Sequence, residues 1–164
     1  MDFFKFVLCA PLLLTMYMGI SSEEAPAANA THLGAVYSIA LDASMPLDEG
    51  LNHEMQYIAI DMTHMENLNP QVKKQILTFF SEKYQVEVMA ATLDELRAKG
   101  FYDPETLMLD GVLLRLTHAD ITESKIVVEG SKYRSGLGAI GTKVVVEWID
   151  GQWQVTQADI TWVS

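Results

Sequence analysis

Cysteine and basic residues are the scarcest chemical groups in this chain of 164 residues. The single cysteine cannot form a disulfide within the chain, and there is no cysteine cluster that could hold a structural zinc ion or an iron–sulfur centre. Only 11 Lys and Arg stand against 22 Asp and Glu, which gives a net charge of -11. Because so acidic a surface repels nucleic acid and anionic lipid, we expect no nucleic-acid partner.

Glycine and proline are also few, at 10 and 5 residues, whereas 49% of the residues are hydrophobic. This composition is typical of folded globular proteins and differs from that of disordered or collagen-like chains. The length fits one domain of ordinary size with a short additional segment. We therefore expect one globular body and exclude two large domains.

An apolar run extends from Phe6 to Ile20 near the start of the chain. It is short for a bilayer core of about 30 Å, but it suits the core of a signal peptide. Small residues at Gly19 and Ser21 form a cleavage site, so residues 1–21 are predicted to be a signal peptide that is removed after Ser21. Because the preceding residues carry little positive charge, an uncleaved membrane anchor is the alternative, and it would be the protein's only contact with a membrane.

The remaining chain is predicted to form a tether and a single α+β domain. Residues 22–31 are rich in Ser, Glu, Ala and Pro, which favours a flexible tether. The domain is predicted over residues 32–164. Apolar residues at helical spacing predict a first helix that begins at an N-cap on Thr31 and ends near Met45.

Two strands with a helix between them are predicted next. Residues 57–60 have the aromatic and β-branched content of a buried strand, and a second short strand is predicted around residues 86–88. Asn69 is a good N-cap and Pro70 suits the first helical position, so a helix is predicted from Pro70 to about Lys83. A helix between two short strands indicates a βαβ-like unit with parallel strands.

A third, short helix is bounded by strong local signals. Thr92 and Glu95 form a capping box, and Ala91 with Leu96 can form the hydrophobic contact that accompanies it. Gly100 stands where a left-handed C-cap is needed. We therefore predict a helix that begins at Thr92 and ends just before Gly100.

Beyond Asp110 the apolar pattern changes to a period of two, which predicts an antiparallel β-meander. The four predicted strands cover residues 112–117, 125–134, 142–149 and 153–163. Asp150-Gly151 is a strong hairpin signal. It pairs residues 146 and 148 with residues 155 and 153, and all four are predicted to be core. The alternation changes phase afterwards, which predicts a bulge near Gln157.

Residues 136–141 have the spacing G-x-G-x-x-G of dinucleotide-binding loops. That chemistry needs a helix directly after the loop, because the helix N-terminus holds the phosphates. Residues 142–149 alternate as a strand, so we predict no nucleotide and no other cofactor. The preferred interpretation is a glycine-rich connection between two strands, in which glycine supplies a positive φ and close approach of the backbone.

The histidines give no metal-binding pattern. His32, His53, His64 and His118 all lack a second histidine three or four residues away, the spacing that places two ligands on one helical face. Asp61 and His64 are near enough in sequence to share a site, but residues at the end of a strand more often cap the following loop. We therefore predict no metal site and assign no catalytic residue.

One cluster in this acidic chain combines basic and aromatic side chains. It consists of Lys132, Tyr133, Arg134 and Ser135, and we predict it as a contact for an anionic or carboxylate-bearing ligand or for a protein partner. The alternative is a tyrosine packed in the sheet between two solvated basic side chains. Whether the sheet encloses an apolar pocket or is filled by the three tryptophans is left open.

Three segments of the last third of the chain belong to one pattern: GSKYRSGLGAIG at 130–141, GQWQV at 151–155 and TWVS at 161–164. This pattern resembles the C-terminal region of uncharacterised exported proteins of Gram-positive bacteria. The resemblance implies an extracytoplasmic domain of unknown function without established catalytic residues. The strand and helix arrangement is also similar to small cystatin-like and nuclear-transport-factor-like folds, but a shared fold does not transmit activity.

The sequence therefore predicts a secreted or cell-envelope protein without enzymatic activity that binds a small ligand or a protein partner. One alternative is a small extracytoplasmic enzyme that uses Asp61 with His64, or Tyr133 with Arg134. The other alternative is a membrane-anchored accessory or inhibitory subunit whose domain lies outside the cell.

Overall fold

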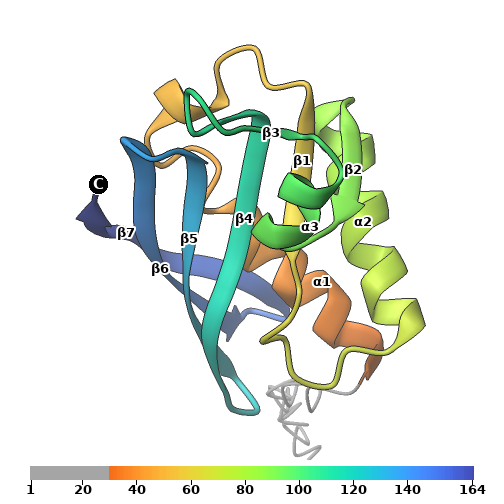
Figure 1. The fold of residues 1–164 in the computed structure, drawn as a ribbon. Coiled ribbons are helices and arrows are strands. Elements are labelled where there is room, and N and C mark those ends of the chain that lie inside the picture. Colours follow the sequence, from red (N-terminus) through yellow and green to blue (C-terminus); the bar gives the residue numbers. More distant parts are fainter. Residues whose placement is uncertain (1–29) are drawn as a thin grey trace, which may run out of the picture.

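The computed structural model describes residues 30–164, which form three α-helices and a seven-stranded mixed sheet (Figure 1). The elements are α1 (Ala30–Asp42), the 3-10 helix η1 (Glu49–Asn52), β1 (Tyr57–Asp61), α2 (Pro70–Tyr84), β2 (Glu87–Ala90), α3 (Leu93–Ala98), β3 (Tyr102–Asp103), β4 (Met108–Ile121), β5 (Lys125–Ser135), β6 (Gly138–Ile149) and β7 (Gln152–Val163). The predicted signal peptide, its cleavage site and most of the tether lie outside the described residues. None of the described helices has both the length and the apolar character needed to cross a membrane.

The strands follow the order β2-β1-β4-β5-β6-β7, and β3 pairs with β4 beside this path. β1 is parallel to both of its neighbours, whereas β4, β5, β6 and β7 are successively antiparallel. α2 connects the parallel strands β1 and β2, as in a βαβ unit. The predicted α+β class and the C-terminal meander are therefore confirmed.

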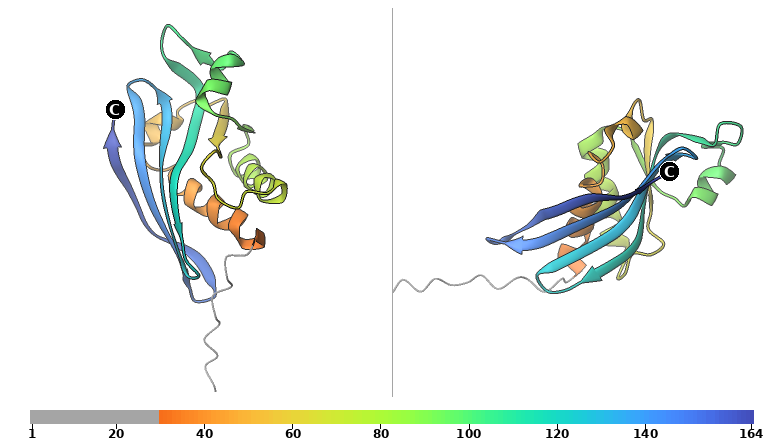
Figure 2. Two further views of the ribbon diagram at one scale, coloured as in Figure 1. Left: turned by 60° about the horizontal axis from the view of Figure 1, so that its bottom comes forward. Right: turned by 90° about the vertical axis from the view of Figure 1, so that its left-hand side faces the viewer.

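Helices cover both faces of the sheet (Figure 2). α1 and α2 pack on one face and enclose the larger core, in which Val36, Ile58, Ile76, Phe80 and Leu114 are fully buried. The smaller core lies on the opposite face, which we call the α3 face, and contains Tyr57, Ala59, Leu96 and Leu113. Alternate residues of β1 and β4 thus point to opposite cores, as the two-residue period of a strand requires.

The predicted N-cap is correct for α2 but not for α1. The Asn69 side chain accepts a hydrogen bond from the backbone N–H of Val72 at 2.9 Å, so the predicted cap of α2 is confirmed. Thr31 lies inside α1 and is not its N-cap, because the helix already includes Ala30. Alanine is the strongest helix former, which favours this earlier start. The two final residues of the predicted tether therefore belong to the helix.

α3 is capped at both ends by local hydrogen bonds. The Thr92 hydroxyl accepts a hydrogen bond from the Glu95 N–H at 3.2 Å, and the Glu95 carboxylate accepts one from the Thr92 N–H at 2.8 Å. Gly100 has a φ of 79°, which permits the N–H of Phe101 to donate to the carbonyl of Leu96 at 2.9 Å. The predicted capping box and C-cap are confirmed, and they set where α3 begins and ends.

The hairpin between β6 and β7 has the predicted turn. Asp150 and Gly151 have φ values of 51° and 80°, and Trp148 pairs with Trp153 across the strands. The register shifts between the pairs Val146–Val155 and Val145–Gln157, where Thr156 is the extra residue, so the bulge predicted near Gln157 is confirmed.

The prediction that both residue pairs of this hairpin are core is wrong in part. Val146 is fully buried, but its partner Val155 is 41% exposed, and both tryptophans are only partly buried. β7 forms an edge of the sheet, so it has one neighbouring strand and a smaller share of the core. Edge position, which alternation does not encode, accounts for the difference.

The glycine-rich segment is a strand connection, as predicted. β5 ends at Ser135 and β6 begins at Gly138, so no helix follows the loop and the nucleotide-binding geometry is absent there. The expected positive φ values are wrong, because no glycine of this segment adopts a left-handed backbone. The expected close approach is found at Gly141, where an added Cβ would overlap the indole ring of Trp162.

Candidate functional site

One row of residues crosses five strands of the sheet. The register pairs Asp61 with Arg115, Arg115 with Ser131, Ser131 with Gly141, and Gly141 with Trp162. Ser131 and Gly141 are small, whereas Arg115 and Trp162 on either side are large. On the face that carries α3, the small side chains therefore leave a depression in the sheet surface between Arg115 and Trp162.

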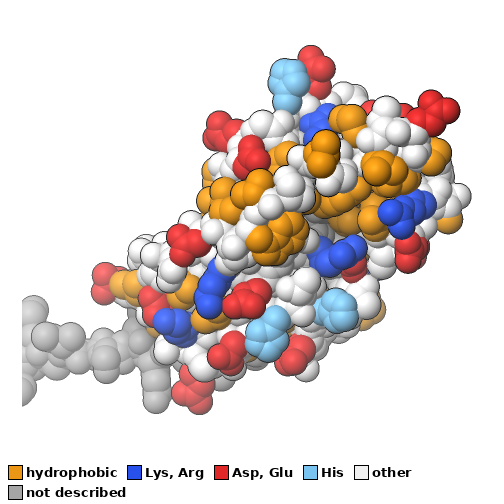
Figure 3. All heavy atoms as spheres, turned by 60° about the vertical axis from the view of Figure 1, so that its left-hand side comes forward, with side chains coloured by type: hydrophobic (Ala, Val, Ile, Leu, Met, Phe, Trp, Pro, Cys, Tyr) orange, Lys and Arg blue, Asp and Glu red, His pale blue; other side chains and the backbone are white. Residues whose placement is uncertain are grey.

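This depression has a volume of about 330 Å³, and we call it the apolar hollow. Its lining comes from α3 and from strands β4 to β7: Leu93, Leu113, Arg115, Thr117, Gly130, Ser131, Tyr133, Ala139 and Trp162. In Figure 3, hydrophobic side chains gather in the upper part of the molecule, with basic side chains beside them and two histidines below. Hydrophobic and aromatic walls with a few polar groups are the usual composition of a small-molecule site.

Trp162 forms the outer wall of the apolar hollow. Because Gly141 has no side chain, the indole lies directly against the backbone of β6. Trp162 is nevertheless 49% exposed. A large aromatic surface thus remains open to solvent in a fixed position, where it can contact a ligand.

A second hollow of about 380 Å³ adjoins the first, and we call it the polar hollow. It is lined by Asp61, Thr63, His64, Thr92, Leu93, Asp94, Arg115 and Thr117, three of which also line the apolar hollow. Arg115 therefore stands at the junction of the two hollows. Its side chain contacts the polar hollow through Asp61 and also lines the apolar hollow with Tyr133 and Trp162.

The carboxylate of Asp61 orients Arg115. Asp61 is only 7% exposed, and its Oδ1 accepts hydrogen bonds from the backbone N–H and the hydroxyl of Thr63, at 3.1 and 2.6 Å. Its Oδ2 accepts a hydrogen bond from Nε of Arg115 at 3.1 Å. Both carboxylate oxygens thus accept hydrogen bonds. The buried carboxylate orients the side chain of Arg115, which is 38% exposed.

The Asp61–Arg115 pair lies at a change of direction in the sheet topology. β1 continues through α2 to β2 on one side, and β2 continues through α3 to β4 on the other side of β1. The two helices lie on opposite faces, and α3 contributes Leu93 and Asp94 to the polar hollow at the carboxyl end of β1, where Asp61 lies. In open sheets with parallel strands, ligands bind at such positions.

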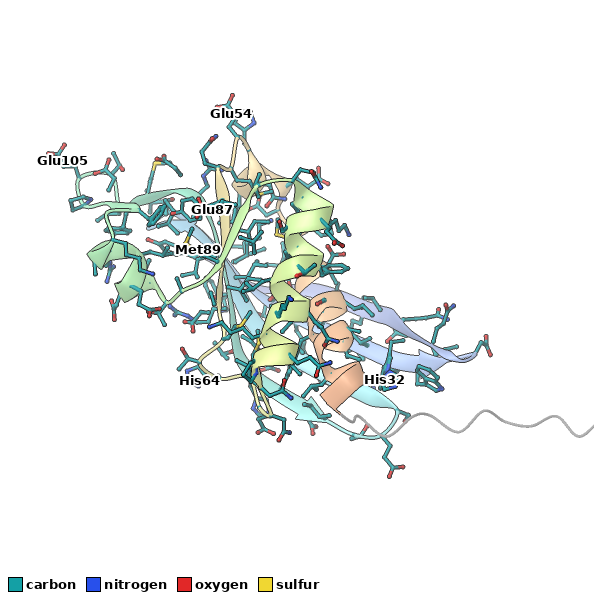
Figure 4. All side chains as sticks on the ribbon, turned by 90° about the vertical axis from the view of Figure 1, so that its right-hand side faces the viewer. His32, Glu54, His64, Glu87, Met89 and Glu105 are labelled. Atoms are coloured by element: carbon teal, nitrogen blue, oxygen red, sulfur yellow. The ribbon has the colours of Figure 1, made fainter. Side chains whose placement is uncertain are left out.

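The hypothesis of a catalytic pair between Asp61 and His64 finds no support in the geometry. His64 is exposed on the loop after β1, and Figure 4 shows it at the opposite end of the molecule from Glu54 and Glu105. It lines the polar hollow, but within residues 30–164 no hydrogen bond joins it to Asp61. The preferred interpretation, in which Asp61 caps the following loop, accounts for its contacts with Thr63. In the same part of the chain, no three His, Cys, Asp or Glu side chains are placed to hold a metal ion.

Lys132 does not lie on the surface. It is fully buried on the side of α1, and its Nζ donates hydrogen bonds to the carbonyl oxygens of Met45, Leu47 and Asp48 at 2.8, 2.6 and 3.0 Å. Burial lowers the pKa of Lys132 to about 8, and the nearby carboxylates of Asp48 and Glu49 oppose this shift. Lys132 is therefore a structural donor to the loop after α1.

Arg134 serves the same part of the chain. Its Nη1 donates to the carbonyl oxygens of Leu51, at 3.0 Å, and His53. Together with Lys132 it binds backbone carbonyls across residues 45–53, which contain η1. Lys132 is buried and committed to contacts within the chain, and Arg134 uses Nη1 for contacts of the same kind. The contact of the four-residue cluster with an anionic ligand or a partner stays a prediction.

Tyr133 and Ser135 alternate with these cations along β5. Tyr133 lines the apolar hollow, and its hydroxyl donates to the carbonyl of Leu107 at 3.1 Å. Burial raises the pKa of the Tyr133 phenol further above its ordinary value. Of the four residues predicted as one contact site, Tyr133 alone belongs to either of the two hollows.

The central residue of the site, Arg115, was not predicted from the sequence. A signal for it exists: it is the single charged residue in the apolar run from Val112 to Leu116. Charged side chains seldom occur inside a buried strand unless they are paired. Its partner could not be inferred from the run itself, because Asp61 is 54 residues away in sequence.

Comparisons of this chain with protein-family models, with curated proteins and with solved structures found no match. The resemblance to exported proteins of Gram-positive bacteria and the similarity to cystatin-like and nuclear-transport-factor-like folds therefore stay predictions. Support for the site comes from its geometry: one row across five strands, two adjoining hollows and an oriented guanidinium between them.

Proposed function

We propose that this chain is an exported domain without enzymatic activity that binds a small, largely apolar ligand in the apolar hollow at the cell envelope. The observation that carries the proposal is the half-exposed indole of Trp162, fixed opposite Arg115 with only Ser131 and Gly141 between them. Concave sites with aromatic walls and few polar groups are typical of small-molecule binding. The apolar run from Phe6 to Ile20 supports export.

A small ligand is favoured over a protein partner by the size of the hollow. Its volume of about 330 Å³ lies at the lower end of the range for ligand pockets, roughly 300–1,000 Å³. A stable protein interface needs about 800 Å² from each partner, far more than this hollow offers. Binding without catalysis is favoured because, within residues 30–164, both oxygens of the Asp61 carboxylate are committed to contacts with Thr63 and Arg115.

The proposal predicts that the mature protein binds a neutral apolar probe. N-phenyl-1-naphthylamine, which fluoresces strongly in apolar surroundings, should bind to the folded chain. Trp162→Ala should weaken this binding about tenfold, because it removes the largest apolar wall of the hollow. Fluorescence titration of both proteins measures the difference.

Ile160→Ala provides the matched control. Ile160 is on the same strand and is exposed to a similar extent, at 44%, but it does not line the apolar hollow. Its replacement should leave probe binding unchanged. Equal losses in the two variants, or no binding to the unmodified chain, would contradict the proposed function.

Export is tested separately. Expression of the full chain in a Gram-positive host should yield a protein outside the cytoplasm that begins at Ser22, because we expect cleavage after Ser21. Cell fractionation followed by N-terminal sequencing checks this. An intact Met1 in the membrane fraction would support the anchored form, and an intact Met1 in the cytoplasm would contradict export.

A further inference from the structure

We propose that the ligand of this site is an amphipathic monocarboxylate, with its carboxylate on Arg115 and its apolar body against Trp162 and Tyr133. This inference rests on the proposed function, because it assigns a chemical class to the ligand of the same hollow. The contacts of Arg115, the charges around it and the distance across the hollow all support this assignment.

Arg115 has free capacity of a specific geometry. Its Nε is used by Asp61 at 3.1 Å, but within residues 30–164 neither terminal nitrogen of the guanidinium has a hydrogen-bond partner. These two nitrogens form a planar fork that matches the two oxygens of a carboxylate. Asp61 holds the fork in place, so little side-chain entropy is lost when a ligand binds.

The surrounding charges select a single negative charge. Asp61 and Asp94 both line the polar hollow, so a dianion such as a phosphate monoester would be repelled at short range. Arg97 is 3.3 Å from Asp94 and lies outside both hollows, so it adds no charge to their lining. A monoanion keeps the contact with Arg115 and meets less of this repulsion.

The apolar hollow receives the rest of the ligand. Three strand spacings of about 4.8 Å separate the backbones of Arg115 and Trp162, which gives about 14 Å. Both side chains line the hollow, so a ligand of medium length can contact them together. Tyr133 and Leu113, which pair with each other in the neighbouring row, line the hollow between them.

Three probes of equal chain length test the assignment: octanoate, octanol and octylamine. In two-dimensional NMR titrations of the mature protein, octanoate should shift the indole N–H resonance of Trp162 and bind with a dissociation constant about tenfold lower than that of octanol. Octylamine should bind no better than octanol. The indole resonances of Trp148 and Trp153, which do not line the hollow, provide internal controls.

Substitutions separate the charge of Arg115 from its shape. Arg115→Gln should remove the preference for octanoate over octanol, and Arg115→Lys should retain only part of it, because lysine keeps the charge but lacks the fork. Lys143→Gln should preserve the preference. Lys143 is a partly exposed cation on β6 that pairs with Glu129 at 3.2 Å and does not line the hollow, so it controls for a general effect of charge.

The outcomes distinguish this inference from the proposed function. Equal binding of octanoate and octanol, or a preference for octanoate that survives in Arg115→Gln, would overturn the carboxylate assignment while leaving a binding hollow. Tighter binding of octylamine would also overturn it and indicate a cationic ligand. If neither these probes nor N-phenyl-1-naphthylamine bind, the proposed function itself fails. Should Arg115→Gln not fold, the comparison of Arg115→Lys with Lys143→Gln decides the question.

Discussion

Replacing Lys132 by methionine is expected to lower the free energy of unfolding by about 3 kcal/mol. Methionine has a similar length but no donor, so the three carbonyl oxygens that Nζ contacts lose this hydrogen bond. The amide of Asn52 still donates to the carbonyl of Met45 at 2.7 Å, which leaves the carbonyls of Leu47 and Asp48 most affected. Urea unfolding of both proteins at neutral pH measures the loss.

The dependence on pH identifies the amine of Lys132 as the cause. Its pKa is about 8 in the folded chain, below the ordinary value of 10.5. Between these two pH values the amine is protonated in the unfolded chain and largely neutral in the folded chain. The stability of the unmodified protein relative to Lys132→Met should therefore rise with pH between about 8 and 10.5, where the unfolded chain binds more protons than the folded chain. Lys143→Met, which removes a surface ion pair, should change stability by about 0.5 kcal/mol at most. A gap that narrows with rising pH, or equal losses in the two variants, would contradict this account.

Gly130→Val is the second substitution with a large expected effect, a loss of about 3 kcal/mol. A Cβ on Gly130 would overlap the carbonyl oxygen of Arg115 on the neighbouring strand. That contact is with backbone at the bulge after Leu116, so a rotamer change cannot relieve it and the strands must separate. Thermal or urea unfolding measures the effect.

Glu129→Val is the matched control for this substitution. Glu129 is the preceding residue of β5 and is exposed, so a β-branched side chain fits there and stability should change by about 0.5 kcal/mol at most. Because Gly130 lies beside Arg115 in the apolar hollow, the Gly130→Val variant should also bind octanoate more weakly. Similar stabilities of the two variants would show that the backbone contact at Gly130 is easily relieved.

Features that depend on neighbouring residues could be predicted from the sequence. The cap at Asn69, the capping box from Thr92 to Glu95 and the turn at Asp150-Gly151 all depend on hydrogen bonds or dihedral angles within a few residues. The α+β class and the meander follow from the change in apolar period beyond Asp110. These interactions are short-range, so the sequence pattern largely determines them.

The site depends on register over long separations, and this could not be predicted. Asp61, Arg115 and Trp162 form one row only because four strand pairings place them opposite one another. A shift of one residue in any pairing would break the row. The sequence pattern defined the strands but not their registers, so the predicted contact cluster was local and only Tyr133 was found in a hollow.

The alternation along β5 predicts that Lys132 is buried, but the residue type argues against burial. Lys132 has the same parity on β5 as Ile126 and Val128, both of which are buried against the helices. Alternation therefore placed Lys132 on the inner face, but lysine is seldom buried without partners. The partners are carbonyls some 85 residues earlier in the chain, which a local pattern does not reveal.

The strict alternation along β5 has a consequence for how this protein can change in evolution. Even-numbered positions 132 and 134 bind carbonyls of the segment after α1, residues 45–53, whereas position 133 lines the apolar hollow. Inserting or deleting a single amino acid between Gly130 and Gly136 would exchange the two sets and disable both at once. Descendants of this chain should therefore vary in the identity of residues along this stretch while conserving its length.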